Sequence, residues 1–343
     1  EVALLDSVLT PLTRIAPFIC ISISIFICGH LAVNGLMTIG EFVTINSFIM
    51  LIVGPLIGFG GLISIVQKGL ASLDRITDFL QLPIESIDDT IDVLPLEDIN
   101  IRYLDFSYEN SKGHALSQVC TTIPKGSFIG IVGKPGSGKS TLFKLLIGLQ
   151  ECPPKSIYLG NQDISDIPLS KLRNSIAYVP TQSYLLSTTI EDNIKFGKDL
   201  PMHESIEVAA KKADLYRDLG DLLQNDLHNL AEEGHDLSGG QKQRINMARG
   251  FYKNAPYVLL DDCFSALDAV TVNIILDTLH MVNNQTILCI SQRLEVIEKA
   301  DKIIVFDEGH IVEEGTHEEL LNHNGLYKTL YEAQKGEMHN EEA

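Results

Sequence analysis

Eight residues, Gly133 to Ser140, carry the clearest chemistry in the sequence. They read Gly-Lys-Pro-Gly-Ser-Gly-Lys-Ser and fit the spacing G-x-x-x-x-G-K-[ST]. An apolar run at 128–132 precedes them and a helix-forming run at 141–147 follows, so the pattern lies between a strand and a helix. Glycines there let backbone N–H groups turn toward phosphate oxygens, and the N-terminus of the helix adds partial positive charge. The stretch predicts that a nucleoside triphosphate, ATP or GTP, binds here.

Each residue of this loop has an expected part in that binding. Lys139 is expected to reach the β- and γ-phosphates, and the hydroxyl of Ser140 is expected to ligate Mg²⁺. A second metal ligand, a carboxylate, follows from the run Tyr257-Val-Leu-Leu-Asp-Asp262, where a buried strand is expected to end at Asp261 and bring it to the same Mg²⁺. The predicted nucleotide-binding residues of the loop are Gly133, Lys134, Pro135, Gly136, Ser137, Gly138, Lys139, Ser140 and Thr141.

Charge and length narrow the class of protein. The chain has 343 residues and a formal net charge of -19. Nucleic-acid binding needs basic surface that replaces counterions, so such an acidic chain is expected to bind no nucleic acid. The length exceeds one typical domain and predicts two. The chain begins at Glu1 rather than at Met, and we expect it to be a piece of a longer polypeptide.

Two apolar runs near the N-terminus predict a lipid bilayer as a partner. Residues 15–33 and 42–67 contain no Lys, Arg, Asp or Glu. Helical spans at about 13–33 and 42–66 match the roughly 20 residues that cross a membrane. The alternative is a pair of buried helices in the core of a soluble protein. Lys68 and Arg75 follow the second run, which favours a cytoplasmic position for everything after it.

These features divide the chain into four segments. Residues 1–82 are expected to form the C-terminal part of a transmembrane domain, and the acidic segment 83–98, with Pro83 and Pro95, a linker. Strand-like and helix-like runs alternate after it, which is typical of a parallel α/β sheet. Residues 99–335 are therefore expected to form the nucleotide-binding domain, and 336–343 a tail.

A third motif links the others to a known family. The run Leu237-Ser-Gly-Gly-Gln-Lys-Gln-Arg244 lies just upstream of the strand that ends at Asp261. Together with the loop at 133–140, it makes the chain resemble the ABC transporters over essentially its whole length. The resemblance implies an α-helical transmembrane segment followed by an α/β P-loop NTPase domain of the ABC type, with a helical subdomain.

The same resemblance implies further site residues and partners. Tyr108 is expected to stack on adenine. Ser238, Gly239, Gly240 and Gln241 are expected to face an ATP held by the opposite domain, so that two domains enclose two nucleotides. The segment 265–268 resembles the loop that signals between the paired sites. Spans fused ahead of the ATP domain, and Glu232-Glu-Gly234, favour an exporter. The implied partner is a second half-transporter, in a multi-pass assembly of the plasma membrane.

Three positions depart from the family pattern. Asp262 stands where active members have the Glu that polarises the attacking water, and Gln292 stands where they usually have His. We take Asp262, Gln292 and Lys139 as the catalytic set. Near Val179-Pro-Thr-Gln182, either Thr181 or Gln182 takes the place of a Gln that reaches the metal, and Gln182 is our metal-ligand candidate.

The departures leave two functions open. One is an ATP-binding/permease subunit of an exporter for an unknown substrate, with a slow ATPase site of its own that resembles the degenerate site of heterodimeric bacterial exporters. The alternative is a regulatory or gating subunit that binds ATP without significant turnover. A drift of these residues that leaves the site active is the simplest competing explanation.

Overall fold

A computed structural model describes most of the chain. The described residues are 2–81, 92–109, 111, 113–196, 203–223, 230–231, 234–235, 237–280 and 284–341. The chain separates into two compact units, Glu1–Ser86 and Ile87–Ala343. Most of the predicted linker 83–98 and the pair 232–233 lie outside the described residues, as do the side chains of the predicted tail.

The first unit is a pair of helices in contact, α1 (Val2–Val33) and α2 (Ile39–Leu80). Helix α2 begins with a capping box: the Thr38 hydroxyl accepts from the Glu41 N–H at 3.3 Å, and the Glu41 carboxylate accepts from the Thr38 N–H at 2.8 Å. Among the described residues, no helix is both long enough and apolar enough to cross a membrane. The predicted spans are therefore not confirmed.

The second unit contains two sheets. One is antiparallel, with strand order β2-β1-β4-β5, and the other is a six-stranded sheet with order β10-β9-β3-β8-β7-β6. The strands are β1 (Ile99–Phe106), β2 (Leu116–Ile123), β3 (Phe128–Gly133), β4 (Ile157–Leu159), β5 (Gln162–Asp163), β6 (Ile176–Val179), β7 (Tyr257–Asp261), β8 (Thr286–Ile290), β9 (Lys302–Asp307) and β10 (His310–Gly315).

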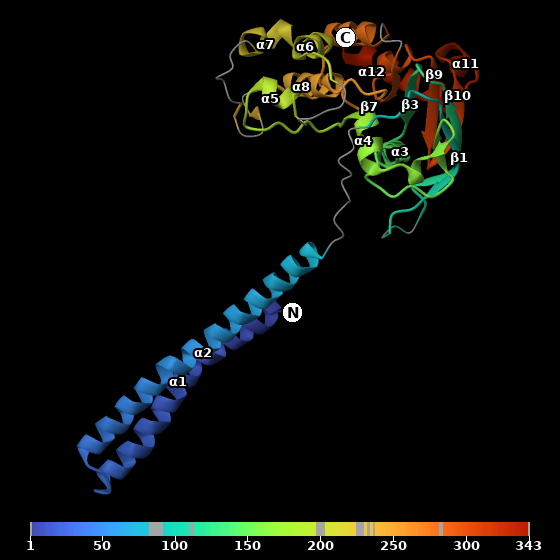
Figure 1. The fold of residues 1–343 in the computed structure, drawn as a ribbon. Coiled ribbons are helices and arrows are strands. Elements are labelled where there is room, and N and C mark those ends of the chain that lie inside the picture. The colour runs from blue at the N-terminus through green and yellow to red at the C-terminus, as the bar shows by residue number, and fades with distance from the viewer. Residues whose placement is uncertain are drawn as a thin grey trace. The chain divides into compact units, whose positions relative to one another are not determined.

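Helices cover the large sheet on both faces, and α5 to α8 gather in a helical subdomain at one side of this unit (Figure 1). The helices of this unit are α3 (Lys139–Leu146), α4 (Leu169–Ser175), α5 (Ile190–Ile194), α6 (Ile206–Lys212), α7 (Tyr216–Leu223), α8 (Gly239–Tyr252), α9 (Ala269–His280), α10 (Leu294–Ile297), α11 (His317–Asn322) and α12 (Leu326–Glu341). The predicted α/β P-loop fold is confirmed in this unit.

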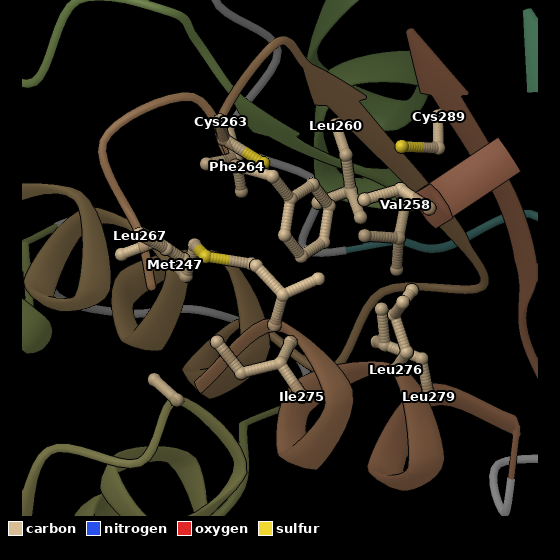
Figure 2. Close-up of a cluster of buried hydrophobic side chains, with 14 of the residues drawn as sticks. Met247, Val258, Leu260, Cys263, Phe264, Leu267, Ile275, Leu276, Leu279 and Cys289 are labelled. Carbon is tan, nitrogen blue, oxygen red and sulfur yellow. The ribbon is translucent and has the colours of Figure 1, made fainter. Parts of the chain in front are cut away.

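The parallel strands of the large sheet, β3 and β6 to β9, are largely buried on both faces, which explains why they read as mostly apolar runs. Ile129 and Ile131 of β3 face a core that includes α3 and the antiparallel sheet. Val258 and Leu260 of β7 face the opposite core, formed with α8 and α9 (Figure 2). Packing from two sides fixes the strands, and therefore also the loops at their ends.

The parallel strands place the predicted site at one edge of the sheet. β3 and β7 both pair with β8, with Ile290 opposite Ile131 on one side and Asp261 on the other. β6 pairs with β7 on its outer side. The carboxyl ends of β3, β8, β7 and β6 therefore meet at one edge, where α/β proteins commonly bind ligands.

Candidate nucleotide-binding site

The loop 133–138 has room only for glycine at two of its positions. Gly133 has φ +148°, and an added Cβ would lie 2.1 Å from the carbonyl oxygen of Phe306. Gly138 has φ +100°, and its Cβ would lie 2.5 Å from the carbonyl oxygen of Ala115. Gly138 also precedes α3 without a side-chain cap. The first N–H groups of α3 are therefore not capped by that residue and suit phosphate oxygens.

Lys139 lies inside the loop that it is predicted to serve. Its Nζ donates to the carbonyl oxygens of Gly133 and Lys134, both at 2.8 Å, and to Ser137 Oγ at 3.2 Å. Burial lowers the pKa of Lys139, and the carboxylates of Asp261 and Asp262 oppose this decrease. The ammonium is thus held at the concave side of the loop, where it can pair with an incoming phosphate.

Asp261, at the end of β7, bonds to α3, to β6 and to the loop after β6. Its Oδ1 accepts from Ser140 Oγ at 3.1 Å and its Oδ2 accepts from the hydroxyl of Tyr178, also at 3.1 Å. The hydroxyl of Thr181 donates to the Asp261 main-chain oxygen at 2.9 Å. Burial and the Asp261 carboxylate both raise the pKa of Tyr178, so the phenol stays a proton donor to Asp261.

Ser140 and Asp261 provide a suitable but incomplete shell for Mg²⁺. One hydroxyl and one carboxylate are the oxygen ligands that this ion prefers. The described residues contain no group of three or more His, Cys, Asp or Glu side chains able to hold a metal. Protein ligands this sparse suit an ion whose other ligands are phosphate and water.

Asp262 follows in an unusual backbone conformation. Its φ is +47°, and its N–H donates to the carbonyl oxygen of Ile290 at 2.8 Å. Gln292 approaches its carboxylate with the main-chain N–H at 3.3 Å and with Nε2 at 3.4 Å. Burial raises the pKa of Asp262, and the Asp261 carboxylate contributes to the increase. The structure therefore brings together Asp262 and Gln292, two of the three predicted departures.

The run 237–244 opens helix α8. Ser238 and Gln241 form a capping box, with Gln241 N–H donating to Ser238 Oγ at 3.2 Å and Ser238 N–H donating to Gln241 Oε1 at 2.9 Å. Gly240 packs closely, since a Cβ there would lie 2.9 Å from the carbonyl oxygen of Ala266. Gly239 is exposed at the helix N-terminus.

Comparison with known proteins gives these features a family. The sequence model described as ABC transporter matches residues 116–265. Over 341 residues the chain is 36% identical to the Bacillus subtilis protein "Probable multidrug resistance ABC transporter ATP-binding/permease protein YheI", covering 98% of this chain and 58% of that one. The chain belongs to the ABC transporter family.

Other relatives are of the same kind. The ATP-dependent lipid A-core flippase of Haemophilus ducreyi is 37% identical over 304 residues, which are 88% of this chain and 52% of the flippase. The solved "Structure of a bacterial Atm1-family ABC exporter with ATP bound" superposes with a TM-score of 0.70 at 29% identity, covering 96% of this chain and 58% of that chain. The chain thus spans a little over half the length of the relatives it matches.

Within this ABC domain, the structure does not bring every predicted residue to the phosphate loop. Tyr108 does lie beside it, because its hydroxyl is 3.2 Å from Thr141 Oγ1 and its ring packs edge-on against Phe106. Thr181 contacts Asp261, whereas Gln182 lines a separate cavity of about 470 Å³ with Tyr184 and other residues. The assignment of Gln182 to the metal stays a prediction.

Some residues that shape the ABC site were missed by sequence reasoning. Gln243 of α8 donates to Ser265 Oγ at 3.2 Å and accepts from the Ala266 N–H at 3.1 Å, which fixes the loop 262–268. Tyr178 is the other, and its only signal is its place near the end of the strand beside β7. Tyr178 and Asp261 are 83 positions apart in the sequence, so their contact corresponds to no local motif.

Proposed function

We propose that this chain is the ATP-binding/permease subunit of an exporter, in which Mg-ATP binding at the loop 133–141 drives conformational change in attached membrane helices. The single observation that carries the proposal is the arrangement of Lys139, Ser140 and Asp261 at one sheet edge. Relatives named as permeases and flippases support the transport part. The charge-free runs 15–33 and 42–67 support insertion in a membrane, with the nucleotide-binding domain in the cytoplasm.

Each residue of the site then has a defined task. Lys139 exchanges its internal acceptors for β- and γ-phosphate oxygens, and Tyr108 provides a face for adenine. Ser140 and Asp261 would hold Mg²⁺, which neutralises phosphate charge when bound. Asp262 accepts a proton from the attacking water, and Gln292 donates a hydrogen bond toward the γ-phosphate.

The proposed intrinsic hydrolysis is slow. The Asp262 carboxylate is one methylene shorter than the glutamate that active relatives of this family carry, and a displacement of about 1 Å can reduce a rate roughly a hundredfold. Gln292 carries no charge and cannot transfer a proton as His does. We therefore propose that the chain pairs with a second half-transporter, to which α8 presents Ser238, Gly239 and Gly240 opposite the partner's ATP.

A regulatory subunit that binds ATP without significant turnover is the second candidate. Asp262 and Gln292 favour this second function, because both weaken hydrolysis without removing the groups that bind phosphate. A partner that carries Glu and His at the matching positions favours the exporter with one degenerate site. ATP-driven transport in vesicles with that partner, compared with vesicles lacking it, separates the two functions.

Substitution of Lys139 tests the nucleotide site itself. We expect Lys139→Ala to weaken Mg-ATP binding by about 10- to 100-fold, because an ammonium–phosphate contact is charge-assisted. Lys125→Ala is the matched control: it is the same residue type outside the loop, and its side chain is 58% exposed and pairs with Glu97. Calorimetric titration of the full chain in detergent measures both. Unchanged affinity in Lys139→Ala contradicts the proposal.

A further inference from the structure

The final helix of the domain, α12, contacts the segment that carries Gln292. Gln334 of α12 accepts at Oε1 from the Leu294 N–H at 2.8 Å and donates from Nε2 to the Gln292 carbonyl oxygen at 3.0 Å. One amide thus pairs with both main-chain groups that flank Arg293. Because a primary amide has one acceptor and one donor end, only Gln or Asn provides this pairing, and Asn is one methylene shorter.

Helix α12 is itself fixed to the core. Tyr327 is fully buried, and its hydroxyl lies 2.7 Å from His317 Nδ1. The Glu313 carboxylate of β10 accepts from the N–H groups of Leu326 and Tyr327 at the start of the helix. Gln334 lies about two turns further along, so its position is set by a rigid anchor rather than by a free C-terminus.

The segment held by Gln334 contacts the site on its other side. Gln292 approaches the Asp262 carboxylate with its own N–H and with Nε2. The Arg293 guanidinium donates to the carbonyl oxygens of Leu267, at 2.5 Å, and Phe264, at 3.3 Å. A shift of 292–294 therefore moves both the group beside the carboxylate and the loop after it.

A small cavity completes the connection. About 240 Å³ of space lies between the phosphate loop and α12, and its lining includes Lys139, Gln292 and Gln334. Gln292 thus has space to change its position when phosphate arrives, and Gln334 faces the same space.

We propose that Gln334 is a positioning residue for the γ-phosphate side of the site, holding Gln292 at Asp262 so that α12 is coupled to whether ATP or ADP is bound. The inference rests on the proposed ATP site and goes beyond it. Gln334 touches neither nucleotide nor metal in this account; it acts through the main chain of 292–294.

The experiment compares the affinities of the full chain for Mg-ATP and Mg-ADP in detergent. In Gln334→Ala we expect ATP affinity to fall about fivefold while ADP affinity stays within about twofold, because only ATP meets the displaced Gln292. Gln334→Glu keeps the acceptor for Leu294 but puts a carboxylate against the Gln292 carbonyl, and is expected to lose the same discrimination. Glu332→Ala is the control, since Glu332 is an exposed residue of the same helix that pairs with Lys328.

Amide hydrogen exchange gives a second readout, which does not depend on a variant that folds. In the unsubstituted chain, the Leu294 amide should exchange more slowly with Mg-ATP than with Mg-ADP. An unchanged ratio of ATP affinity to ADP affinity in both Gln334 variants overturns the inference. The same holds if the affinities for both nucleotides fall equally and the melting temperature of the variant is lower. Failure of the unsubstituted chain to bind ATP refutes the proposed function instead, and the inference falls with it.

Discussion

Asp261 and Asp262 are neighbours in sequence but have different surroundings. Asp261 is 5% exposed and accepts from two hydroxyl groups, Ser140 and Tyr178. Asp262 lies at positive φ, its carboxylate accepts from Gln292, and burial raises its pKa. These different environments suit the Asp261 carboxylate to binding a metal and the Asp262 carboxylate to accepting a proton.

The length of residue 262 should control the rate of hydrolysis. We expect Asp262→Glu to raise ATP turnover about tenfold or more, because the added methylene advances the carboxylate toward the attacking water. Phosphate release with saturating Mg-ATP measures this rate. Asp262→Asn is the control, with similar volume and no basic group, and should remove the residual activity. If the unsubstituted chain hydrolyses ATP fast and Asp262→Glu does not raise the rate, the departure at this position is drift without loss of function.

Lys253 should make the stability of the domain depend on pH. Its Nζ donates to the carbonyl oxygens of Arg173 and Ile176, and burial lowers its pKa to about 8. The unfolded chain keeps the proton up to its ordinary pKa, so between pH 8 and about 10 the unfolded state binds more protons and stability rises with pH.

This dependence can be isolated by comparison with Lys253→Met, which keeps the volume and lacks the titrating group. The free energy of unfolding of the original chain, relative to that of the variant, should increase by about 2 kcal/mol between pH 8 and pH 10. Chemical denaturation at several pH values measures it. A parallel pH dependence in both proteins would assign the lysine an ordinary pKa.

At this scale, motifs predict the residues that meet at the phosphate loop and miss the residues that hold them in place. Lys139, Ser140 and Asp261 follow from local spacing and strand context. Tyr178 and Gln334 do not, because each acts through a side chain that meets its partner only after the sheet and α12 have folded.

Among the elements, the junction between β3 and α3 depends most on a single residue type. Gly138 lies against the antiparallel sheet, with Leu116 Cδ2 2.8 Å from an added Cβ in addition to the Ala115 oxygen. Main-chain atoms cannot move away without disturbing β2, so the contact is a true steric limit.

Alanine substitutions at two glycines of this loop should therefore differ. Gly136 also has positive φ, +79°, but nothing lies within 4 Å of its added Cβ. We expect Gly136→Ala to cost about 1 kcal/mol from backbone strain alone, and Gly138→Ala about 3 kcal/mol or more from strain and collision together. Denaturant unfolding of the domain gives both values. Equal losses would mean that the loop adjusts to the collision.

Three strands of the large sheet could be predicted, whereas those of the smaller sheet could not. Apolar runs at 128–132, 257–260 and 286–290 indicate buried parallel strands. Strands β1 and β2 pair with irregular register, and Tyr103 has φ +46° at one irregularity. Bulges of this kind depend on cross-strand packing, which no local pattern encodes.

For the whole molecule, the proposed pairing with a second half-transporter can be tested at the N-terminus of α8. Gly239 has only ordinary contact in its own domain, since the Ala266 Cβ lies 3.7 Å from its added Cβ. A side chain there would project from the helix N-terminus without disturbing the fold. A substitution at Gly239 can therefore distinguish nucleotide binding by one chain from the assembly of two chains around a nucleotide.

We therefore expect Gly239→Glu to leave Mg-ATP binding of the chain unchanged and to reduce ATP turnover in the pair with its partner by about 100-fold, because a carboxylate would repel the facing γ-phosphate. Gly239→Ala, of neutral charge, should reduce turnover far less. Phosphate release by the co-purified pair measures both. Full turnover with Gly239→Glu would exclude a nucleotide shared between α8 and a second domain.

The three internal bonds of Lys139 have a kinetic consequence. An arriving triphosphate replaces carbonyl and hydroxyl acceptors that the Lys139 ammonium already has. The ammonium therefore has hydrogen-bond acceptors both before the ligand binds and after it leaves. Capture of a triphosphate therefore exchanges neutral acceptors for charged phosphate oxygens, and on release the loop itself takes the ammonium back, which lowers the cost of the step in which the nucleotide leaves.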